Sequence, residues 1–362
     1  MIATGSPILT HGSPLLTRSR QRWDYWRRVL AAYLGSGASQ LSFWHELPAA
    51  NFEARIAQLG TRVSEAEVRP QGRSDPSTLG QYFMTFEEKA DYQGPFDDNG
   101  IPLLDYRGRL GKQYNPIAIA QYGLGNFNQF HKNGSGARRR RFLRVADWLT
   151  ENLEENGAGL KVWHHHFDWE YRDTLRAPWY SGLAQGQGIS VLVRAAQDTG
   201  EARYQEAADK AFEALVTPVD KGGTLFVDRE GRKWIEEYIV EPPTHILNGF
   251  LWALWGVRDY ASATGNEKAG RLFEDCVETL KSNLARFDSG FWSLYEQSGT
   301  GLKMMASPFY HALHIVQLQV MHWLTGEEIF QKYALKWEGY RRSFLKRNRA
   351  LAHKIVFKVL YY

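Results

Sequence analysis

The sequence contains a single cysteine and no long apolar run. Because Cys276 stands alone among 362 residues, an intrachain disulfide framework and a multi-cysteine metal site are both excluded. Cys276 falls in a helical pattern and is interpreted as a core residue. A membrane-spanning helix requires an apolar run of about 18 residues, and no run in this sequence approaches that length. Residues 1–18 also lack the apolar core of a secretory signal. These absences favour a cytoplasmic or membrane-peripheral protein.

Motifs that carry several common chemistries are also missing. The sequence has no GxGxxG, P-loop, HExxH or GxSxG motif, which removes support for nucleotide-binding, zinc-protease and α/β-hydrolase functions. His164–His166 resembles a metal-binding tract, but adjacent residues of a strand point to opposite faces, so we predict no metal site. A net charge of only +4 does not indicate a nucleic-acid partner. The basic runs Arg138–Arg141 and Arg341–Lys358 are interpreted as solvated faces, with an anionic glycan or a membrane surface as the alternative.

Aromatic residues, in contrast, are abundant. Hydrophobic residues make up 43% of the chain and aromatic residues 14%, so the protein is expected to fold around a large core. Aromatic side chains stack on the apolar faces of sugar rings, and they also collect in large cores. Composition therefore gives only a weak indication of carbohydrate binding.

Four apolar helical segments recur at intervals of about 65 residues, beginning near Asn115, Tyr180, His245 and Tyr310. Each is followed by a short break and then by a second, amphipathic helix. The breaks contain glycine, which suits the position after a helix because it takes positive φ at little cost. They are Asn133-Gly134, Thr199-Gly200, Thr264-Gly265 and Thr325-Gly326. The chain is therefore predicted to repeat a helical hairpin four times.

The apolar character of the first helices predicts how the hairpins pack. Ile246–Val257 is apolar on nearly all sides, as expected for helices inside a ring, while the charged second helices lie outside. The predicted fold is mainly α: an incomplete (α/α) toroid, or barrel, of about four helical hairpins with β-hairpin inserts and a small N-terminal α+β region. The inserts are expected to cover one mouth of the ring and to carry function. The expected divisions are a disordered tail (1–18), an N-terminal helical and β-hairpin region (19–110), an (α/α) catalytic domain (111–345) and a basic C-terminal tail (346–362).

Polar residues gather where the inserts meet the predicted inner helices. Glu236, Glu237 and Tyr238 precede the third inner helix. Tyr295 lies in the next insert, and Tyr310 opens the fourth inner helix. Each residue alone is equally consistent with a solvated or a packed side chain. Their joint position at one mouth of the ring favours a functional site.

The fourth inner helix also carries a polar face. Tyr310, His314 and Gln317 lie at positions i, i+4 and i+7 of this helix, so their side chains share one side. Because the inner helices surround the interior of the ring, we expect this face to point into a cavity.

Four parts of the sequence together resemble a known family. They are Tyr114–Leu124, Trp179–Gly186, Glu236–Tyr238 with Leu247–Phe250, and Tyr310–Leu318. In order and spacing, from about residue 110 to 340, they are similar to the C-terminal domain of heparan-sulfate glucuronyl C5-epimerases. The resemblance implies the (α/α) fold predicted above. It also implies a bacterial-type version without the β-sandwich domain of the animal enzymes.

The resemblance further implies the site residues. The family's catalytic set corresponds to Glu237, Tyr238, Tyr295 and Tyr310. The family carries an arginine three residues after the tyrosine that matches Tyr295, expected to hold the substrate carboxylate, and Ser298 stands there in this chain. Arg176 and Lys303 are the replacements that we consider. The expected substrate-binding residues are Tyr114, Gln121, Arg176, Trp179, Tyr180, Gln185, Asn248, Lys303, His311 and His314.

The implied activity is a C5-epimerase that converts D-glucuronate to L-iduronate residues within an acidic, heparosan-like polysaccharide without a cofactor. C5 lies next to a carboxylate, so removal of its proton requires cations or strong donors at the carboxylate, a base on one face of the ring and a proton donor on the other. We assign Glu237 and Tyr310 to opposite faces, with Tyr238 and Tyr295 polarising the carboxylate. Glutamate is expected to be ionised at neutral pH, and nearby cations would lower a phenol's pKa so that it acts as a base.

The expected partner is a glucuronate-containing polysaccharide, with a homodimer left open and no nucleic acid. A uronate polysaccharide lyase is one alternative, because lyases abstract the same C5 proton and then expel the C4 substituent. A glycan-binding protein without catalysis is another, and the missing arginine is its best support.

Overall fold

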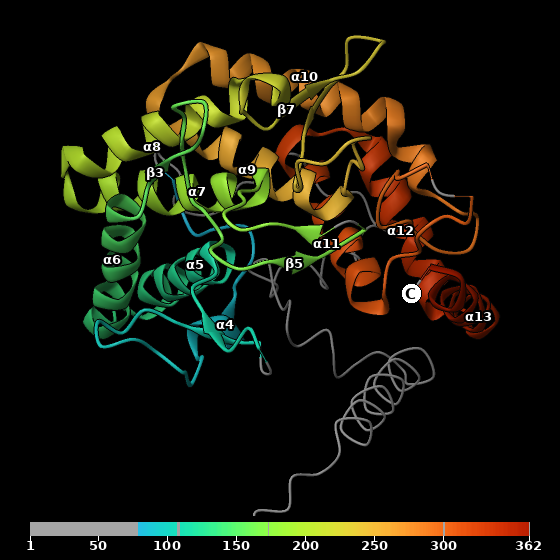
Figure 1. The fold of residues 1–362 in the computed structure, drawn as a ribbon, viewed down its shortest axis with the longest axis horizontal. Helices are drawn as coiled ribbons and strands as arrows, with labels where there is room; N and C mark the ends of the chain where they lie inside the picture. The colour runs from blue at the N-terminus through green and yellow to red at the C-terminus, as the bar shows by residue number, and fades with distance from the viewer. Residues whose placement is uncertain (1–78, 107–108, 173, 300, 362) are drawn as a thin grey trace, which may run out of the picture.

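The structure is a computed structural model that describes residues 79–106, 109–172, 174–299 and 301–361. Eight helices of this part form four hairpins that follow one another along an arc, from blue-green to red in Figure 1. They are α5 (Pro116–Asn133) with α6 (Gly136–Glu151), α7 (Gly182–Thr199) with α8 (Ala202–Val216), α9 (Leu247–Thr264) with α10 (Glu267–Asn283), and α11 (Pro308–Thr325) with α12 (Glu328–Arg342). The predictions for residues 1–18 and for most of 19–110 lie outside the described residues.

Local sequence explains where these helices begin and end. The side chains of Asn115, Ser181, Asn266 and Ser307 each accept a hydrogen bond from a backbone N–H in the first turn of α5, α7, α10 and α11. At each break the chain leaves the first helix through the predicted glycine. Gly200, for example, has a φ of 74°, which a residue without a Cβ adopts at little cost.

The first helix of each hairpin is the more buried one, as predicted. In α7 every residue of 182–195 is buried, whereas α8 buries one face. α7 packs against both α5 and α9. Two glycines permit a close approach of α7 to α9. A Cβ added to Gly256 of α9 would lie only 2.2 Å from the carbonyl oxygen of Gly186 in α7. The prediction of a mainly helical (α/α) toroid with inner and outer helices is confirmed.

Short antiparallel strand pairs occupy the inserts between the hairpins, as predicted. The inserts that lead to α7 and α9 carry β5–β6 and β7–β8, and both contribute to the site described below. The pairs are β1 (Leu104–Asp105) with β2 (Lys112–Gln113), β3 (Glu154–Glu155) with β4 (Lys161–Val162), β5 (Trp169–Glu170) with β6 (Thr174–Leu175), and β7 (Leu225–Val227) with β8 (Lys233–Ile235). Single turns complete the inserts: α4 (Glu87–Ala90), η4 (Val219–Lys221) and η5 (Leu284–Phe287).

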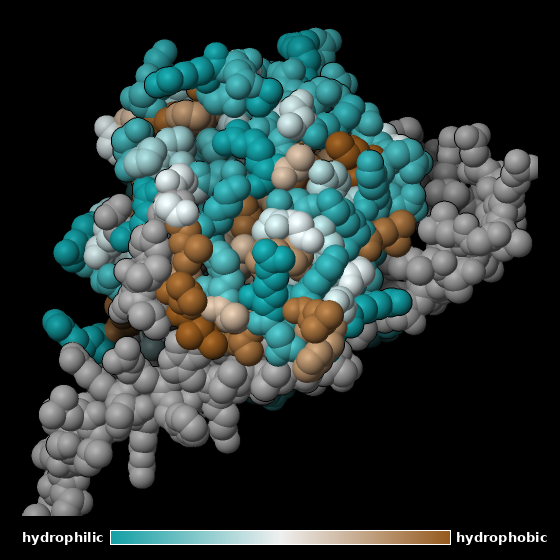
Figure 2. All heavy atoms as spheres, turned by 90° about the vertical axis from the view of Figure 1, so that its right-hand side faces the viewer, coloured by the Kyte–Doolittle hydropathy of each residue, from teal (hydrophilic) through white to brown (hydrophobic). Residues whose placement is uncertain are grey.

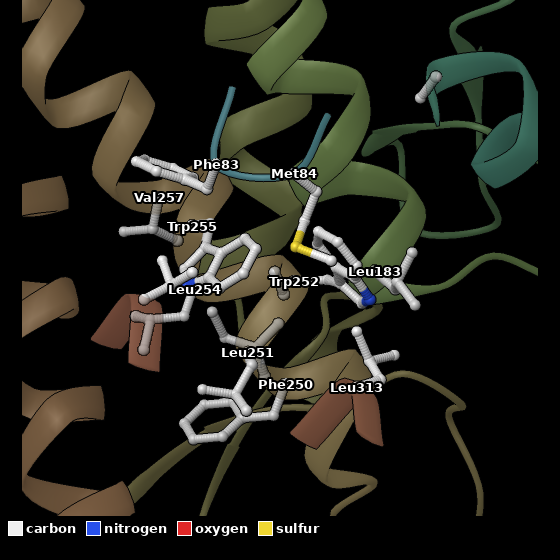
Figure 3. Close-up of a cluster of buried hydrophobic side chains, with 14 of the residues drawn as sticks. Phe83, Met84, Leu183, Phe250, Leu251, Trp252, Leu254, Trp255, Val257 and Leu313 are labelled. Carbon is white, nitrogen blue, oxygen red and sulfur yellow. The ribbon is translucent and has the colours of Figure 1, made fainter. Parts of the chain in front are cut away.

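Aromatic side chains fill the space between the inner helices and the segment that precedes α4. Figure 3 shows Phe83 and Met84 of this segment beside Trp252 and Trp255 of α9. All four side chains are buried. The ring of Phe83 meets Trp255 edge-on with 5.3 Å between centroids, and the two tryptophans are 4.8 Å apart. The high aromatic content therefore serves the core as well as the surface.

A fully buried ion pair joins the inner helices α7 and α9. Arg194 and Asp259 are 1% and 0% exposed, and Nη1 of the arginine donates to a carboxylate oxygen at 2.6 Å.

Asp259→Ala is expected to lower the free energy of unfolding by about 3–5 kcal/mol, because it leaves a buried guanidinium without its partner. Urea denaturation measures the loss. The matched control is Asp275→Ala, which removes an exposed pair with Lys233 and should cost less than about 1 kcal/mol. Equal losses would contradict the role of the buried pair.

The basic C-terminal segment is helical. Phe344–Tyr361 form a helix, α13, that packs against α12. The physical reason is an apolar face, since Ala350, Leu351 and Phe357 are buried. Among the described residues, no helix has both the length and the apolar character required to cross a lipid bilayer.

Candidate active site

The structure brings the four proposed catalytic residues together. Glu237 and Tyr238 follow β8, Tyr295 lies between η5 and α11, and Tyr310 is in the first turn of α11. Tyr238 acts on the Glu237 carboxyl group and lowers its pKa, and Tyr295 acts in the same direction on the Tyr310 hydroxyl, in both cases against the larger effect of burial. The rings of Tyr295 and Tyr310 are 4.9 Å apart. The backbone N–H of Leu247, at the start of α9, donates to the carbonyl of Tyr295 and ties two of the inserts together.

Glu237 is held in place by the inner helices. Its side chain is buried, and Nδ2 of Asn248 donates to Oε2 at 3.4 Å. Gln317 of α11 in turn donates to the backbone carbonyl of Asn248 at 3.0 Å. The chain of contacts runs from α11 through α9 to the carboxylate. It places Asn248 as a residue that positions Glu237.

The protonation state of Glu237 differs from the prediction. Burial raises the pKa of this carboxyl to about 8, with a smaller contribution from the nearby carboxylates Glu296 and Glu236 and an opposing effect of Tyr238. The prediction of an ionised glutamate at neutral pH is therefore wrong. Glu237 mostly carries its proton at pH 7, because the buried charged form loses its hydration.

The three tyrosines keep their protons more firmly than ordinary phenols. Burial raises the pKa of Tyr310 to about 12, and it raises the pKa values of Tyr238 and Tyr295 well above 10. The electrostatic effect of Glu237 adds to the increase for each of them. The predicted lowering of a phenol pKa by nearby cations is thus contradicted. At neutral pH these four side chains are mostly uncharged, so they do not repel an incoming carboxylate.

Sequence reasoning missed a second pair beside the cluster. The hydroxyl of Tyr171 donates a hydrogen bond to the carboxylate of Glu296, and its ring lies 4.7 Å from the ring of Tyr238. Burial raises the pKa of Glu296. Glu296 follows Tyr295 directly, which was an available signal. Tyr171 comes from the distant β5–β6 hairpin, and nothing in its local sequence distinguishes it.

Partly exposed aromatic rings surround the buried acids. Trp179 meets the ring of Tyr238 edge-on at 5.6 Å and stacks on His165 at 3.8 Å. Phe309 lies against Tyr310 with 5.2 Å between ring centroids. Such rings suit the apolar face of a sugar. The prediction of Trp179 as a substrate-binding residue agrees with this position and stays a prediction.

Two cations act electrostatically on Glu296. Arg172 donates to the carbonyls of Pro242 at 3.2 Å and Ser298 at 3.4 Å, and Lys354 of α13 donates to the carbonyl of Met305 at 3.4 Å. Both lower the pKa of Glu296 against the larger effect of burial. Arg172 thus contacts residue 298 itself, the position where the family arginine is replaced.

Arg176 and Lys303, the predicted replacements, are both exposed. Arg176 forms an ion pair with Asp168. Lys303 lies in the segment that precedes α11, next to Met304, whose carbonyl accepts from the backbone N–H of Tyr295. Their part in binding a substrate carboxylate remains a prediction, and Arg172 and Lys354 are the cations that act on Glu296.

Three predicted substrate-binding residues are fully buried and serve the fold. Oε1 of Gln185 accepts from the backbone of Trp163, and its Nε2 donates to two carbonyls. His311 and His314 both contact the Ser293 hydroxyl, at 2.7 and 3.0 Å. All three side chains are 0% exposed, and the two histidines support the segment that carries Tyr295, so a role in substrate binding stays a prediction. The predicted polar face of α11 is likewise exposed only at its first turn, because Gln317 is also buried.

The other predicted binding residues make contacts at the edges of the hairpins. The Tyr114 hydroxyl donates to Asp97 at 2.8 Å, and the Tyr180 hydroxyl donates to the carbonyl of Gly222 at 2.8 Å. Gln121 is buried and donates to Gln187 at 3.2 Å. A role for these three residues in substrate binding stays a prediction. Within the described ranges, no three His, Cys, Asp or Glu side chains are grouped to hold a metal ion.

Gly249 permits the position of Glu237. A Cβ at residue 249 would lie 2.1 Å from Oε2 of Glu237, so Gly249→Ala must displace the carboxylate. We expect the turnover rate in the proposed reaction to fall by about a hundredfold. The matched control is Gly270→Ala in α10, where a Cβ meets nothing within 4 Å. It should keep full activity and add about 0.5–1 kcal/mol of stability. Full activity of Gly249→Ala would contradict the described position of Glu237.

About half of the chain matches known proteins in sequence. Residues 158–339, about half of the chain, match the family described as D-glucuronyl C5-epimerase C-terminus. An uncharacterized protein of Methanocaldococcus jannaschii is 32% identical over 198 residues, which cover 54% of this chain and 63% of that protein. The D-glucuronyl C5-epimerase of Caenorhabditis elegans is 30% identical over 214 residues, which cover 55% of this chain and 34% of that enzyme.

The chain therefore spans less than two thirds of the length of either relative. Among solved structures, the cellobiose 2-epimerase of Spirochaeta thermophila aligns with a TM-score of 0.43 at 12% identity, covering 61% of this chain and 57% of that one. The extent of the family match, together with the 30% identity to the nematode enzyme, establishes the family of the chain. It belongs to the D-glucuronyl C5-epimerase C-terminus family.

Proposed function

We propose that the protein is a polysaccharide C5-epimerase that converts D-glucuronate to L-iduronate residues in a heparosan-like glycan. The observation that carries the proposal is that one buried carboxyl group, Glu237, acts electrostatically on the phenols of Tyr238, Tyr295 and Tyr310. A proton acceptor and a proton donor are the two groups that inversion at C5 requires. The family membership and the surrounding aromatic rings support a uronate sugar as the substrate.

In this proposal Glu237 and Tyr310 act on opposite faces of the sugar ring. The ionised form of Glu237 takes the C5 proton, and the electron pair of the C–H bond moves into the carboxylate to give an enediolate. Tyr310 then delivers its proton to C5 from the other face. Because burial places the pKa of Glu237 near 8 and that of Tyr310 near 12, the ionised free enzyme carries its charge on Glu237. Proton exchange with water restores the starting state.

The enediolate needs positive charge or strong donors at the substrate carboxylate. The proposal assigns this role to the phenols of Tyr238 and Tyr295, aided by Arg172 and Lys354. These two cations already act on Glu296 beside the cluster. They would take the place of the arginine that this chain lacks at residue 298.

The pH dependence of the reaction follows from the pKa of Glu237. The base must be ionised, and a pKa of about 8 leaves roughly a tenth of the free enzyme in that form at pH 7. We expect kcat/KM, which reports the free enzyme, to rise with pH and to level off above about 8. Initial rates of C5 proton exchange across neutral and mildly alkaline buffers measure this. A profile that is flat or falls through the same range would contradict Glu237 as the base.

The decisive experiment incubates the protein in D2O with heparosan, with and without N-sulfation, and follows the C5 proton by NMR. Loss of that signal together with new iduronate signals is the expected result. Exchange accompanied by unsaturated chain ends would instead identify a uronate lyase. Binding of both polymers without any exchange would overturn the proposal in favour of a non-catalytic glycan-binding protein.

A further inference from the structure

The outward face of α13 is apolar. Leu345 is 79% exposed, Val356 50% and Ile355 38%, and Ala352 is also exposed. Spacings of three, four and seven residues place these four side chains on one side of the helix. Phe344, at the first position of α13, is 62% exposed beside them. Figure 2 views the side of the molecule on which α13 lies, and brown, hydrophobic residues gather in the lower part of its described surface.

The charged residues of α13 itself are all positive. Seven lysines and arginines and no acidic residue follow Glu338 in the sequence. Lys346 and Arg347 are partly exposed and Arg349 is exposed, so cations lie beside and within the apolar face. The ammonium of Lys346 lies 3.9 Å from the Tyr340 ring centroid. Long basic side chains at the border of an apolar face can extend toward phosphate groups while their stems stay on apolar surface.

The inward face fixes α13 to the protein. The Lys354 ammonium, 9% exposed, donates to the carbonyl of Met305. From the exposed side of the helix, the guanidinium of Arg349 lies 4.1 Å from the centroid of the Phe291 ring. Met305 and Phe291 belong to the segment that carries Tyr295, so α13 is attached to that segment.

We propose that the outward face of α13 docks on an anionic phospholipid bilayer. An acidic polysaccharide would match the charge but not Leu345, Ile355 and Val356, whereas lipid matches both, with acyl chains for the aliphatic side chains and phosphates for the cations. The helix lies in the plane of the membrane surface and does not cross it. This inference does not depend on the proposed epimerase activity.

The test is sedimentation of the full chain with vesicles. Wild-type protein is expected to bind vesicles of equal parts phosphatidylcholine and phosphatidylglycerol, to bind pure phosphatidylcholine much more weakly, and to dissociate as salt is raised. The double variant Leu345→Glu/Val356→Glu should lower the partition coefficient by about a hundredfold. The control Val227→Glu changes a residue with 47% exposure in β7 and should bind like wild type.

Three results would overturn the proposal. The first is equal binding of the wild type to both vesicle types. The second is binding of the double variant at the wild-type level. The third is a wild-type protein that does not bind vesicles and forms a dimer, with a double variant that is monomeric. The last result, seen by sedimentation velocity, would assign the face to a second copy of the chain. Both variants replace exposed side chains, and circular dichroism checks that each folds.

Discussion

Tyr310→Phe is expected to lower the rate of iduronate formation from glucuronate by about a thousandfold, within the range that a positioned acid or base contributes. The change removes one hydroxyl and keeps the ring against Tyr295 and Phe309. The variant should therefore fold and bind heparosan as the wild type does. Loss of turnover with unchanged binding separates a proton carrier from a packing residue. Single-turnover formation of iduronate, with glycan affinity measured in parallel, gives both quantities.

The matched control for this prediction is Tyr333→Phe. Tyr333 lies on the outer helix α12, with its ring 5.8 Å from Trp337 and distant in sequence from the proposed catalytic set. It should retain full activity. If Tyr310→Phe forms iduronate at the wild-type rate, Tyr310 is not the donor, and the neighbouring phenol of Tyr295 becomes the next candidate.

Sequence alone predicted the arrangement of helices well, because the signals are local. Each hairpin break is marked by a glycine such as Gly200, and each inner helix is apolar on most sides, as α7 and α9 are. These features depend only on nearby residues. The grouping of Glu237 with Tyr295 and Tyr310 also followed, because each residue sits where an insert meets an inner helix.

Side-chain environment was harder to predict. Gln185 and His311 lie on inner helices, and periodicity places them on an inward face, but it does not tell whether that face meets solvent or a neighbouring backbone. The pKa of Glu237 depends on how completely the surrounding helices remove water, which no local pattern encodes. Tyr171 reaches the site from a hairpin far away in the chain, so only the folded structure shows its contact with Tyr238.

Glu237→Gln is expected to lower the rate of C5 proton exchange by about a thousandfold, because an amide cannot accept the proton. The same change is expected to stabilise the fold. Burial raises the pKa of Glu237 from its ordinary 4.5 to about 8, so the folded state binds more protons than the unfolded state between these values. Ionisation of Glu237 therefore lowers the free energy of unfolding as the pH rises from about 4.5, and this loss reaches its full size above about pH 8.

Glutamine resembles the protonated carboxyl in shape and carries no charge to bury. The free energy of unfolding of Glu237→Gln should therefore exceed that of the wild type at pH 7, and the difference should widen up to about pH 8. Urea denaturation at several pH values measures this beside the activity assay. A variant that loses activity and also loses stability would show that the carboxylate supports the fold rather than the chemistry. Lower activity together with higher stability is the result expected for a buried carboxyl group that acts as the catalytic base.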